Sequence, residues 1–196
     1  MDTRIIPWQI RTEEECLHTE WFSIKKSEAI LPNGTSIAEY YSMDTGDSVM
    51  IVALDENRNV IMKNEYRLPL KSVVLELPAG GIEPCDNSPL DAAKRELKEE
   101  TGYVSDDWHL MGKTYDLPER CSGGLYLFVA YNARCVAGQA LDETEDVESK
   151  LVPLEEAVKM CCDGEIKVNS SCHALFRVHY DLYKMTEGGG NVSAAE

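Results

Sequence analysis

Hydrophobic residues fall in short runs separated by turn residues along much of the chain, which predicts several strands. The run Ser48 to Leu54 (SVMIVAL) is continuous and bounded by glycine and acidic residues, as expected of a strand buried on both faces. Residues 59–63 are expected to return as its hairpin partner. Further strands are expected at residues 73–77, 108–115 and 125–131, the last rich in β-branched and aromatic residues.

A helix is predicted between Ser88 and Gly102. Ser88 is a good N-cap, Pro89 suits the first helical position, and strong helix formers follow as far as Gly102, which favours a C-terminal stop. A final helix is expected at residues 170–184. The apolar strip of the first helix consists of Leu90, Ala93 and Leu97.

Three carboxylates of the first helix face the same way. At about 100° per residue, Glu96, Glu99 and Glu100 fall within one third of the circumference, beside the apolar strip. Like charges four residues apart cost roughly a few tenths of a kcal/mol, so a cation is expected there. Hard oxygen ligands suit Mg²⁺ or Mn²⁺. From the residues alone, a solvated acidic face balanced by Arg95 and Lys98 is an equally open interpretation.

The stretch from Gly81 to Tyr103 resembles the signature box of the Nudix hydrolases, in which fixed gaps separate a glycine, an arginine, several glutamates and a second glycine. The resemblance implies the Nudix α/β/α sandwich around a mixed β-sheet, with the acidic helix binding metal. The residues that match in register are Gly81, Arg95, Glu96, Leu97, Glu99, Glu100 and Gly102.

Two positions depart from the box. Asn87 stands where the family has its first glutamate, and Tyr103 replaces the usual aliphatic residue. In the family that glutamate supports the arginine, here Arg95, and the metal-binding helix. We expect Asp86 or Asp91 to substitute for it.

Segments on both sides of the box resemble the ADP-ribose pyrophosphatase branch of this family. The sequence ELPAGG before the box implies that Arg67 contacts a phosphate and that the Ala79 carbonyl ligates a metal. Pro118 lies where that branch carries a marker proline, although Ser122-Gly123-Gly124 replaces the glycine and acidic residue that usually follow it.

An acidic loop lies just before the last strand, at residues 138–148. By the same resemblance, Glu143 is the expected base and Glu145 the residue that reaches the metals. Glu148 is a rival base, and a solvated loop is the alternative interpretation.

The chain is expected to comprise residues 1–47 as a β-rich appendage, 48–185 as the Nudix domain and 186–196 as a disordered tail. In the appendage, residues 21–31 and 36–43 form a hairpin about the turn Pro32-Asn33-Gly34. An isolated hairpin is marginal in water, so we expect it to pack on the main domain or on a second subunit. The resemblance to the ADP-ribose pyrophosphatase branch implies a homodimer. Trp8 and Trp21 are candidates to stack on a base, with ordinary packing as the alternative.

The composition of the chain limits which kinds of molecule are expected to bind it. With 19 Lys and Arg against 35 Asp and Glu, the 196-residue chain has a net charge of −16, which argues against binding to nucleic acid or an anionic membrane. Its seven cysteines show neither a disulfide framework nor zinc spacing. Because no signal-peptide core or membrane-length apolar run is evident, a cytoplasmic protein is expected.

The combined expectation is Mg²⁺-dependent (or Mn²⁺-dependent) hydrolysis of the pyrophosphate bond in a nucleotide sugar, with ADP-ribose giving AMP and ribose 5-phosphate. Alternatives are another nucleotide sugar or dinucleotide, a catalytically silent metabolite-binding module, and an acidic face that binds a partner protein. The expected site residues are Glu143, Glu99 and Arg95 for catalysis, Arg67, Trp21 and Pro118 for substrate binding, and Ala79, Glu96, Glu100 and Glu145 for metal.

Overall fold

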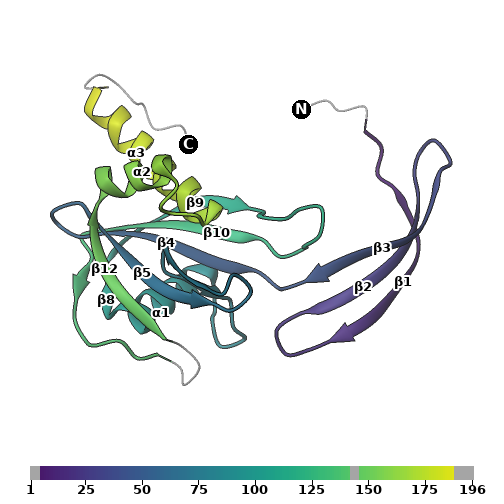
Figure 1. Cartoon of the computed structure of the whole chain (residues 1–196), viewed down its shortest axis with the longest axis horizontal. Coiled ribbons are helices and arrows are strands. Elements are labelled where there is room, and N and C mark those ends of the chain that lie inside the picture. Colours follow the sequence, from purple (N-terminus) through teal and green to yellow (C-terminus); the bar gives the residue numbers. More distant parts are fainter. Residues whose placement is uncertain (1–4, 142–145, 188–196) are drawn as a thin grey trace. The chain divides into compact units, whose positions relative to one another are not determined.

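The computed structural model describes residues 5–141 and 146–187 and divides the chain into two compact units (Figure 1). The first unit combines the N-terminal residues up to Asp47 with the segment Tyr115–Leu125. The second unit consists of Ser48–Thr114 and the chain from Tyr126 onward. The second unit therefore contains both the predicted buried strand and the acidic helix.

The first unit is a three-stranded antiparallel sheet in the order β1-β2-β3. Strands β2 (Ser23–Ile30) and β3 (Ser36–Asp44) form the predicted hairpin, which closes where the Gly34 amide donates to the Leu31 carbonyl at 2.9 Å. The hydrophobic pattern does not predict β1 (Gln9–His18), because every residue of that strand is exposed. Pairing with β2 along its length is what makes this segment a strand.

The segment Tyr115–Leu125 folds onto β3. The Met43 amide donates to the Arg120 carbonyl at 2.7 Å, and the Ser122 amide donates to the Met43 carbonyl at 3.0 Å. These two bonds form a parallel bridge between Met43 and Cys121. A segment distant in sequence thereby becomes part of the first unit.

The second unit is built on a seven-stranded sheet in the order β12-β5-β4-β10-β9, with β6 paired to β5 and β7 paired to β4. The predicted buried strand is confirmed, since all residues of β4 after Ser48 are buried. A separate two-stranded ladder pairs β8 (Tyr103–Val104) with β11 (Arg134–Cys135). The strands of the main sheet are β4 (Ser48–Leu54), β5 (Asn59–Arg67), β6 (Ser72–Glu76), β7 (Ala79–Gly81), β9 (Asp107–Thr114), β10 (Leu125–Tyr131) and β12 (Val147–Pro153).

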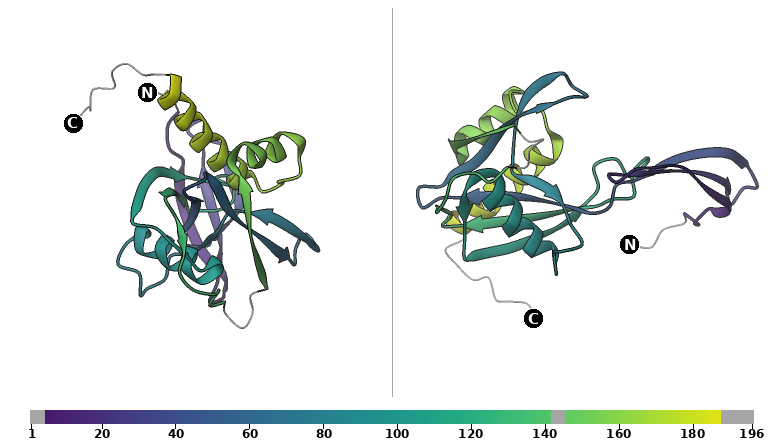
Figure 2. Two further views of the ribbon diagram at one scale, coloured as in Figure 1. Left: turned by 90° about the vertical axis from the view of Figure 1, so that its left-hand side faces the viewer. Right: turned by 90° about the horizontal axis from the view of Figure 1, so that it is seen from below.

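Helices cover both faces of this sheet, which confirms the predicted α/β/α sandwich (Figure 2). Helix α1 (Pro89–Thr101) lies on one face, and α3 (Asn169–Glu187), with α2 (Leu154–Asp163) packed beside it, lies on the other. Among residues 5–141 and 146–187, no helix is both long and apolar enough to cross a membrane.

The core beneath α1 fixes the rotation of that helix. Ala93 and Leu97 of the predicted strip are fully buried against Val49 and Ile51 of β4 and Phe128 of β10. Because Glu96 and Glu100 adjoin this strip, burying it brings both carboxylates close to the sheet. Packing of the apolar face thus positions the acidic face.

Candidate active site

Local capping defines the ends of α1 as the sequence predicts. The Ser88 hydroxyl accepts a hydrogen bond from the Asp91 amide at 3.2 Å. At the other end, Gly102 adopts φ 74° and its amide donates to the Lys98 carbonyl at 2.8 Å. The helix therefore has a fixed length, and its three glutamates have fixed positions relative to the strands below.

Glu96 and Glu100 lie against the short strand β7. A Cβ atom on Gly80 would be 2.1 Å from Oε1 of Glu96, so only glycine leaves room for that carboxylate. The Ala79 amide donates to Oε2 of Glu100 at 3.1 Å. Both glutamates are buried, whereas the Glu99 side chain is 41% exposed. The structure therefore brings together Ala79, Glu96 and Glu100, three of the four expected metal residues.

Arg95 organises the exposed side of this cluster. Its Nη1 donates to Glu96 at 2.8 Å and to Glu99 at 3.1 Å, and its Nη2 donates to the Gly81 carbonyl at 2.9 Å. The guanidinium also donates to Asp86, at 3.2 Å from Nε and 3.0 Å from Nη2. This bidentate contact holds the pKa of Asp86 below its usual value.

The contact between Asp86 and Arg95 explains how the box arginine is held although Asn87 stands where the family has a glutamate. Of the two residues expected to substitute for the missing glutamate, Asp86 contacts Arg95, whereas Asp91 lies in the first turn of α1 with its amide at the Ser88 cap. The Asn87 side chain is exposed. A carboxylate one residue earlier in the chain therefore supports Arg95.

No motif in the sequence identifies Lys63, although the structure places it at the centre of the cluster. The residue is 1% exposed on β5, and its ammonium forms ion pairs with Oε1 of Glu100 and, at 2.8 Å, with Oε2 of Glu65. Oε1 of Glu76 lies 3.9 Å from Nζ of Lys63. The sequence pattern that could have indicated Lys63 is the alternation of charged residues, Lys63, Glu65 and Arg67, along one face of β5.

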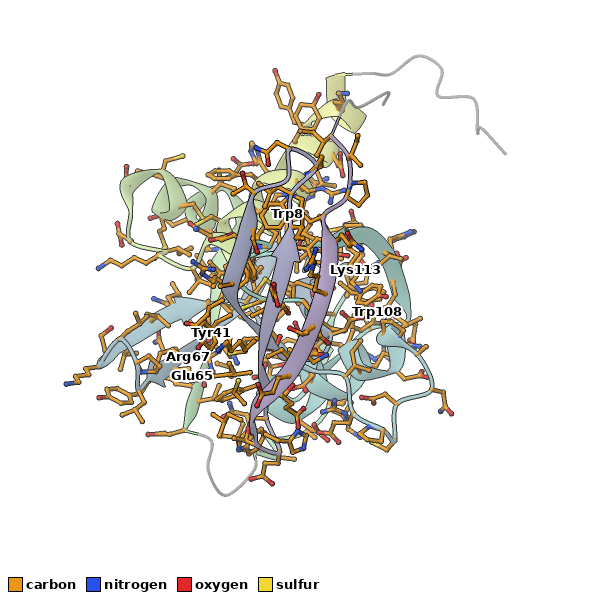
Figure 3. All side chains as sticks on the ribbon, turned by 90° about the vertical axis from the view of Figure 1, so that its right-hand side faces the viewer. Trp8, Tyr41, Glu65, Arg67, Trp108 and Lys113 are labelled. Atoms are coloured by element: carbon orange, nitrogen blue, oxygen red, sulfur yellow. The ribbon has the colours of Figure 1, made fainter. Side chains whose placement is uncertain are left out.

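Arg67 extends this network toward solvent. Its guanidinium pairs with Glu65 at 2.7 Å and with Glu76, and its side chain is 41% exposed. Glu65 and Arg67 lie side by side on the β5–β6 hairpin (Figure 3). One connected group of ion pairs thus joins two cations to three carboxylates, one of which belongs to α1. Its members are Lys63, Arg67, Glu65, Glu76 and Glu100.

Burial and charge act in opposite directions on this group. Burial lowers the pKa of Lys63, but the carboxylates of Glu100 and Glu65 outweigh it, so the pKa of Lys63 is raised overall. Burial raises the pKa of Glu100 to about 7 despite the opposing effect of Lys63. One ammonium therefore does not fully compensate the buried charge of Glu100.

The donor chemistry of this cluster fits a hard divalent cation. It holds the buried carboxylates of Glu96 and Glu100, whose oxygens are of the hard type that Mg²⁺ or Mn²⁺ prefers, and Gly80 leaves open the space that the Glu96 carboxylate fills. Over the described ranges 5–141 and 146–187, no three Asp, Glu, His or Cys side chains converge as a metal-binding group. The carboxylates are held instead by Lys63 and Arg95.

The other expected site residues are divided between the two units. Arg67 lies in the second unit, whereas Pro118 and the 76% exposed Trp21 lie in the first. Trp8 packs edge-on against Tyr40 with ring centroids 6.1 Å apart. The expected base Glu143 and metal residue Glu145 lie outside the described residues. The rival base Glu148 is the second residue of β12, where its Oε2 accepts a hydrogen bond from the Asn64 side chain at 3.1 Å.

Gln139 anchors the chain on the last turn of α1. Its side-chain amide donates to the carbonyl of Glu100 at 2.6 Å and to that of Val147 at 3.0 Å. The next amide, from Ala140, donates to the Glu99 carbonyl at 2.8 Å. The described residues that enter and leave the acidic loop are therefore attached to the carboxylate helix, which the sequence pattern does not reveal.

The family of this chain follows from its similarity to known proteins. A family model described as "NUDIX domain" matches residues 44–168, which is more than half of the chain. This chain belongs to the Nudix family. The segment from Gly81 to Tyr103, which includes α1 and the loop before it, is thus its Nudix box, and Asp86 contacts the box arginine Arg95.

Named relatives cover most of this Nudix chain. An "ADP-ribose pyrophosphatase" of Bacillus subtilis is 30% identical over 146 residues, covering 74% of this chain and 78% of the relative. A "GDP-mannose pyrophosphatase" of Yersinia enterocolitica is 30% identical over 165 residues, covering 78% and 85%. The crystal structure of an "ADP compounds hydrolase" superposes with a TM-score of 0.80 at 24% identity, covering 95% of this chain and 99% of that one. This last likeness shows the shared fold.

Proposed function

We propose that this Nudix protein hydrolyses the pyrophosphate bond of a nucleoside diphosphate sugar, with ADP-ribose as the leading substrate and AMP and ribose 5-phosphate as products. The observation that carries the proposal is the buried pair Glu96 and Glu100, held against Ala79 and Gly80 in a Nudix box. Relatives named as ADP-ribose and GDP-mannose pyrophosphatases support the substrate class.

The proposed cofactor is Mg²⁺ or Mn²⁺, held by the Ala79 carbonyl and by Glu96, Glu100 and Glu145. When bound, such a cation neutralises pyrophosphate oxygens and acidifies water. Arg95 keeps Glu96 and Glu99 oriented through the hydrogen bonds from its Nη1. Because Asp86 holds the opposite edge of the same guanidinium, that orientation is fixed from both sides.

Arg67 is proposed to bind a substrate phosphate. Its guanidinium is partly exposed and is oriented by Glu65 and Glu76, which leaves it accessible from solvent at the end of β5. A planar fork of donors suits phosphate oxygens. The two carboxylates preorganise the side chain, which reduces the entropy lost when a phosphate binds.

Glu143 is proposed as the general base, activating the attacking water. The hydrogen bonds of Gln139 and Ala140 to the last turn of α1 support this proposal, because they attach the described residues that precede Glu143 in sequence to the helix bearing Glu99 and Glu100. Glu148 is the competing assignment. Its hydrogen bond to Asn64 directs it along the β5–β12 pair.

We also propose a cytoplasmic homodimer in which the first unit contributes Trp21 and the Pro118 loop to substrate binding. Several apolar side chains of that unit are more than 60% exposed, among them Ile5, Ile10 and Trp21, and a second copy would cover them. The net charge of −16 supports a small-molecule substrate over nucleic acid or an anionic membrane.

A second candidate is the same reaction on another nucleotide sugar. The sequence Ser122-Gly123-Gly124 follows Pro118 where the ADP-ribose branch carries a glycine and an acidic residue, and one similar relative is named for GDP-mannose. A catalytically silent binding module is less well supported, because Asp86 provides the carboxylate partner for Arg95 that Asn87 does not provide.

One assay tests these functions. Purified protein is incubated with Mg²⁺ and ADP-ribose, ADP-glucose, GDP-mannose, NADH or diadenosine polyphosphates, and the products are resolved by chromatography. We expect Mg²⁺-dependent release of AMP from ADP-ribose, abolished by Glu100→Gln. Faster turnover of GDP-mannose would favour the second candidate. Tight nucleotide binding without turnover of any substrate would replace the enzyme with the binding module.

A further inference from the structure

Lys63 is unusual because an ammonium group lies fully inside the protein beside the proposed metal site. The strand around it is apolar, with Val60, Ile61 and Met62 buried immediately before it. Burying an unpaired ammonium is costly, so a lysine persists at such a position only with close carboxylates. Glu100 and Glu65 provide them.

The position of Glu100 links this lysine to the metal-binding residues. Glu100 is shared, because its Oε1 pairs with Lys63 while its Oε2 accepts the Ala79 amide on β7. Any cation that binds Glu100 therefore meets the positive charge of Lys63 across one carboxylate. Like charges in a poorly solvated site repel more strongly than they do in water.

A count of formal charges shows how much of the negative charge of the carboxylates Lys63 offsets. Lys63 and Arg67 supply two positive charges against the three carboxylates of Glu65, Glu76 and Glu100, which leaves −1. Without Lys63 the same group carries −2. The arrangement thus supplies internally part of the positive charge that a bound divalent cation would otherwise supply.

We propose that Lys63 is a positioning residue that acts as a built-in counter-cation of Glu100 and thereby weakens the intrinsic affinity of the site for divalent cations. The inference rests on the proposed function, in which Glu100 ligates Mg²⁺ or Mn²⁺. Lys63 keeps the Glu100 carboxylate oriented when no metal is bound. It also makes metal loading depend on the negative charge that the nucleotide substrate brings.

A purely structural role predicts something different. If Lys63 only stabilised the fold, removing its charge would lower stability equally with and without metal. If Lys63 acts as a counter-cation, metal takes over its role, so the loss of stability is large in EDTA and small in Mg²⁺. The two roles are therefore separated by how stability depends on metal.

The test uses the full chain at pH 8 without nucleotide. Mn²⁺ binding is measured by electron paramagnetic resonance for the unsubstituted protein, Lys63→Met and Lys63→Gln, and thermal unfolding is followed in EDTA and in Mg²⁺. We expect a dissociation constant about tenfold lower in both variants, from the loss of one repelling charge. Lys63→Gln keeps a hydrogen-bond donor for Glu100 while removing the charge.

Lys26→Gln is the matched control, because Lys26 forms a 2.6 Å ion pair with Glu39 in the first unit. Its Mn²⁺ affinity is expected to be unchanged. A Lys63 variant that folds only with metal supports the proposal. Unchanged or weaker Mn²⁺ binding, or a failure to fold with and without metal, overturns it. Absence of Mn²⁺ binding by the unsubstituted protein would instead overturn the metal site of the proposed function, and the inference with it.

Discussion

Asp86 accepts two hydrogen bonds from the Arg95 guanidinium, at 3.2 Å from Nε and 3.0 Å from Nη2. The other edge of that guanidinium holds Glu96 and Glu99. The Nudix box of this chain therefore keeps its arginine in place although Asn87 stands where the family has a glutamate. Because the contact is bidentate, it fixes the plane of the guanidinium as well as its position.

Removing the Asp86 carboxylate should loosen Arg95. We expect Asp86→Asn to lower kcat/KM by about tenfold and the free energy of unfolding by about 1 kcal/mol, the scale of a hydrogen bond to a charged group that is partly solvated. Steady-state kinetics and urea denaturation measure the two effects. Asp91→Asn is the control, since Asp91 lies at the start of α1, and it should retain nearly full activity.

Restoring the family's glutamate tests the same relationship in reverse. Asn87→Glu alone should change activity little, because Asp86 already occupies the far edge of the Arg95 guanidinium. Combined with Asp86→Asn, it should recover much of the lost kcat/KM. Equal losses in the single Asp86 variant and in the double variant would show that a carboxylate at position 87 cannot reach Arg95.

A side chain at Gly80 should displace the Glu96 carboxylate. A Cβ atom there would lie 2.1 Å from the Glu96 carboxylate, so Gly80→Ala must displace a proposed metal ligand. We expect kcat to fall by about a hundredfold or more, since small displacements of catalytic groups have effects of that size. In Gly81→Ala the new Cβ meets no atom within 4 Å, and the free energy of unfolding should stay close to that of the unsubstituted protein.

The identity of the base can be tested by two isosteric changes. Glu143→Gln should lower kcat by about a hundredfold or more while leaving KM largely unchanged, because general-base catalysis contributes on that scale. Glu148→Gln should have a much smaller effect, since its carboxylate is bound to Asn64. A reversal of these two results would assign the base to Glu148.

The contribution of Asp86 to stability should depend on pH. Its pKa in the folded protein lies below the unfolded value, chiefly because of the hydrogen bonds from Arg95. That contribution is therefore complete above the unfolded pKa, about 3.9, and is lost as pH falls through the folded pKa. The difference in unfolding free energy between the unsubstituted protein and Asp86→Asn should be constant at neutral pH and narrow in acid. A constant difference down to pH 2 would contradict this assignment.

Several elements of this fold follow from local patterns in the amino-acid sequence. The caps Ser88 and Gly102 and the strip Leu90, Ala93 and Leu97 predict α1, and the apolar run of β4 predicts a doubly buried strand. These patterns suffice because capping and helical or strand periodicity depend on residues only a few positions apart. The spacing of the Nudix box gave the family and the acidic face by the same local route.

The distant residues that surround those carboxylates become apparent in the folded chain alone. Lys63 meets Glu100 across 37 positions of sequence, and Cys121 forms a bridge with Met43 of β3, which is distant from it in sequence. Strand β1, exposed along its whole length, likewise depends on its partner β2. The physical reason is that strand register and helix packing bring these groups together, and neither is encoded in the spacing of neighbouring residues.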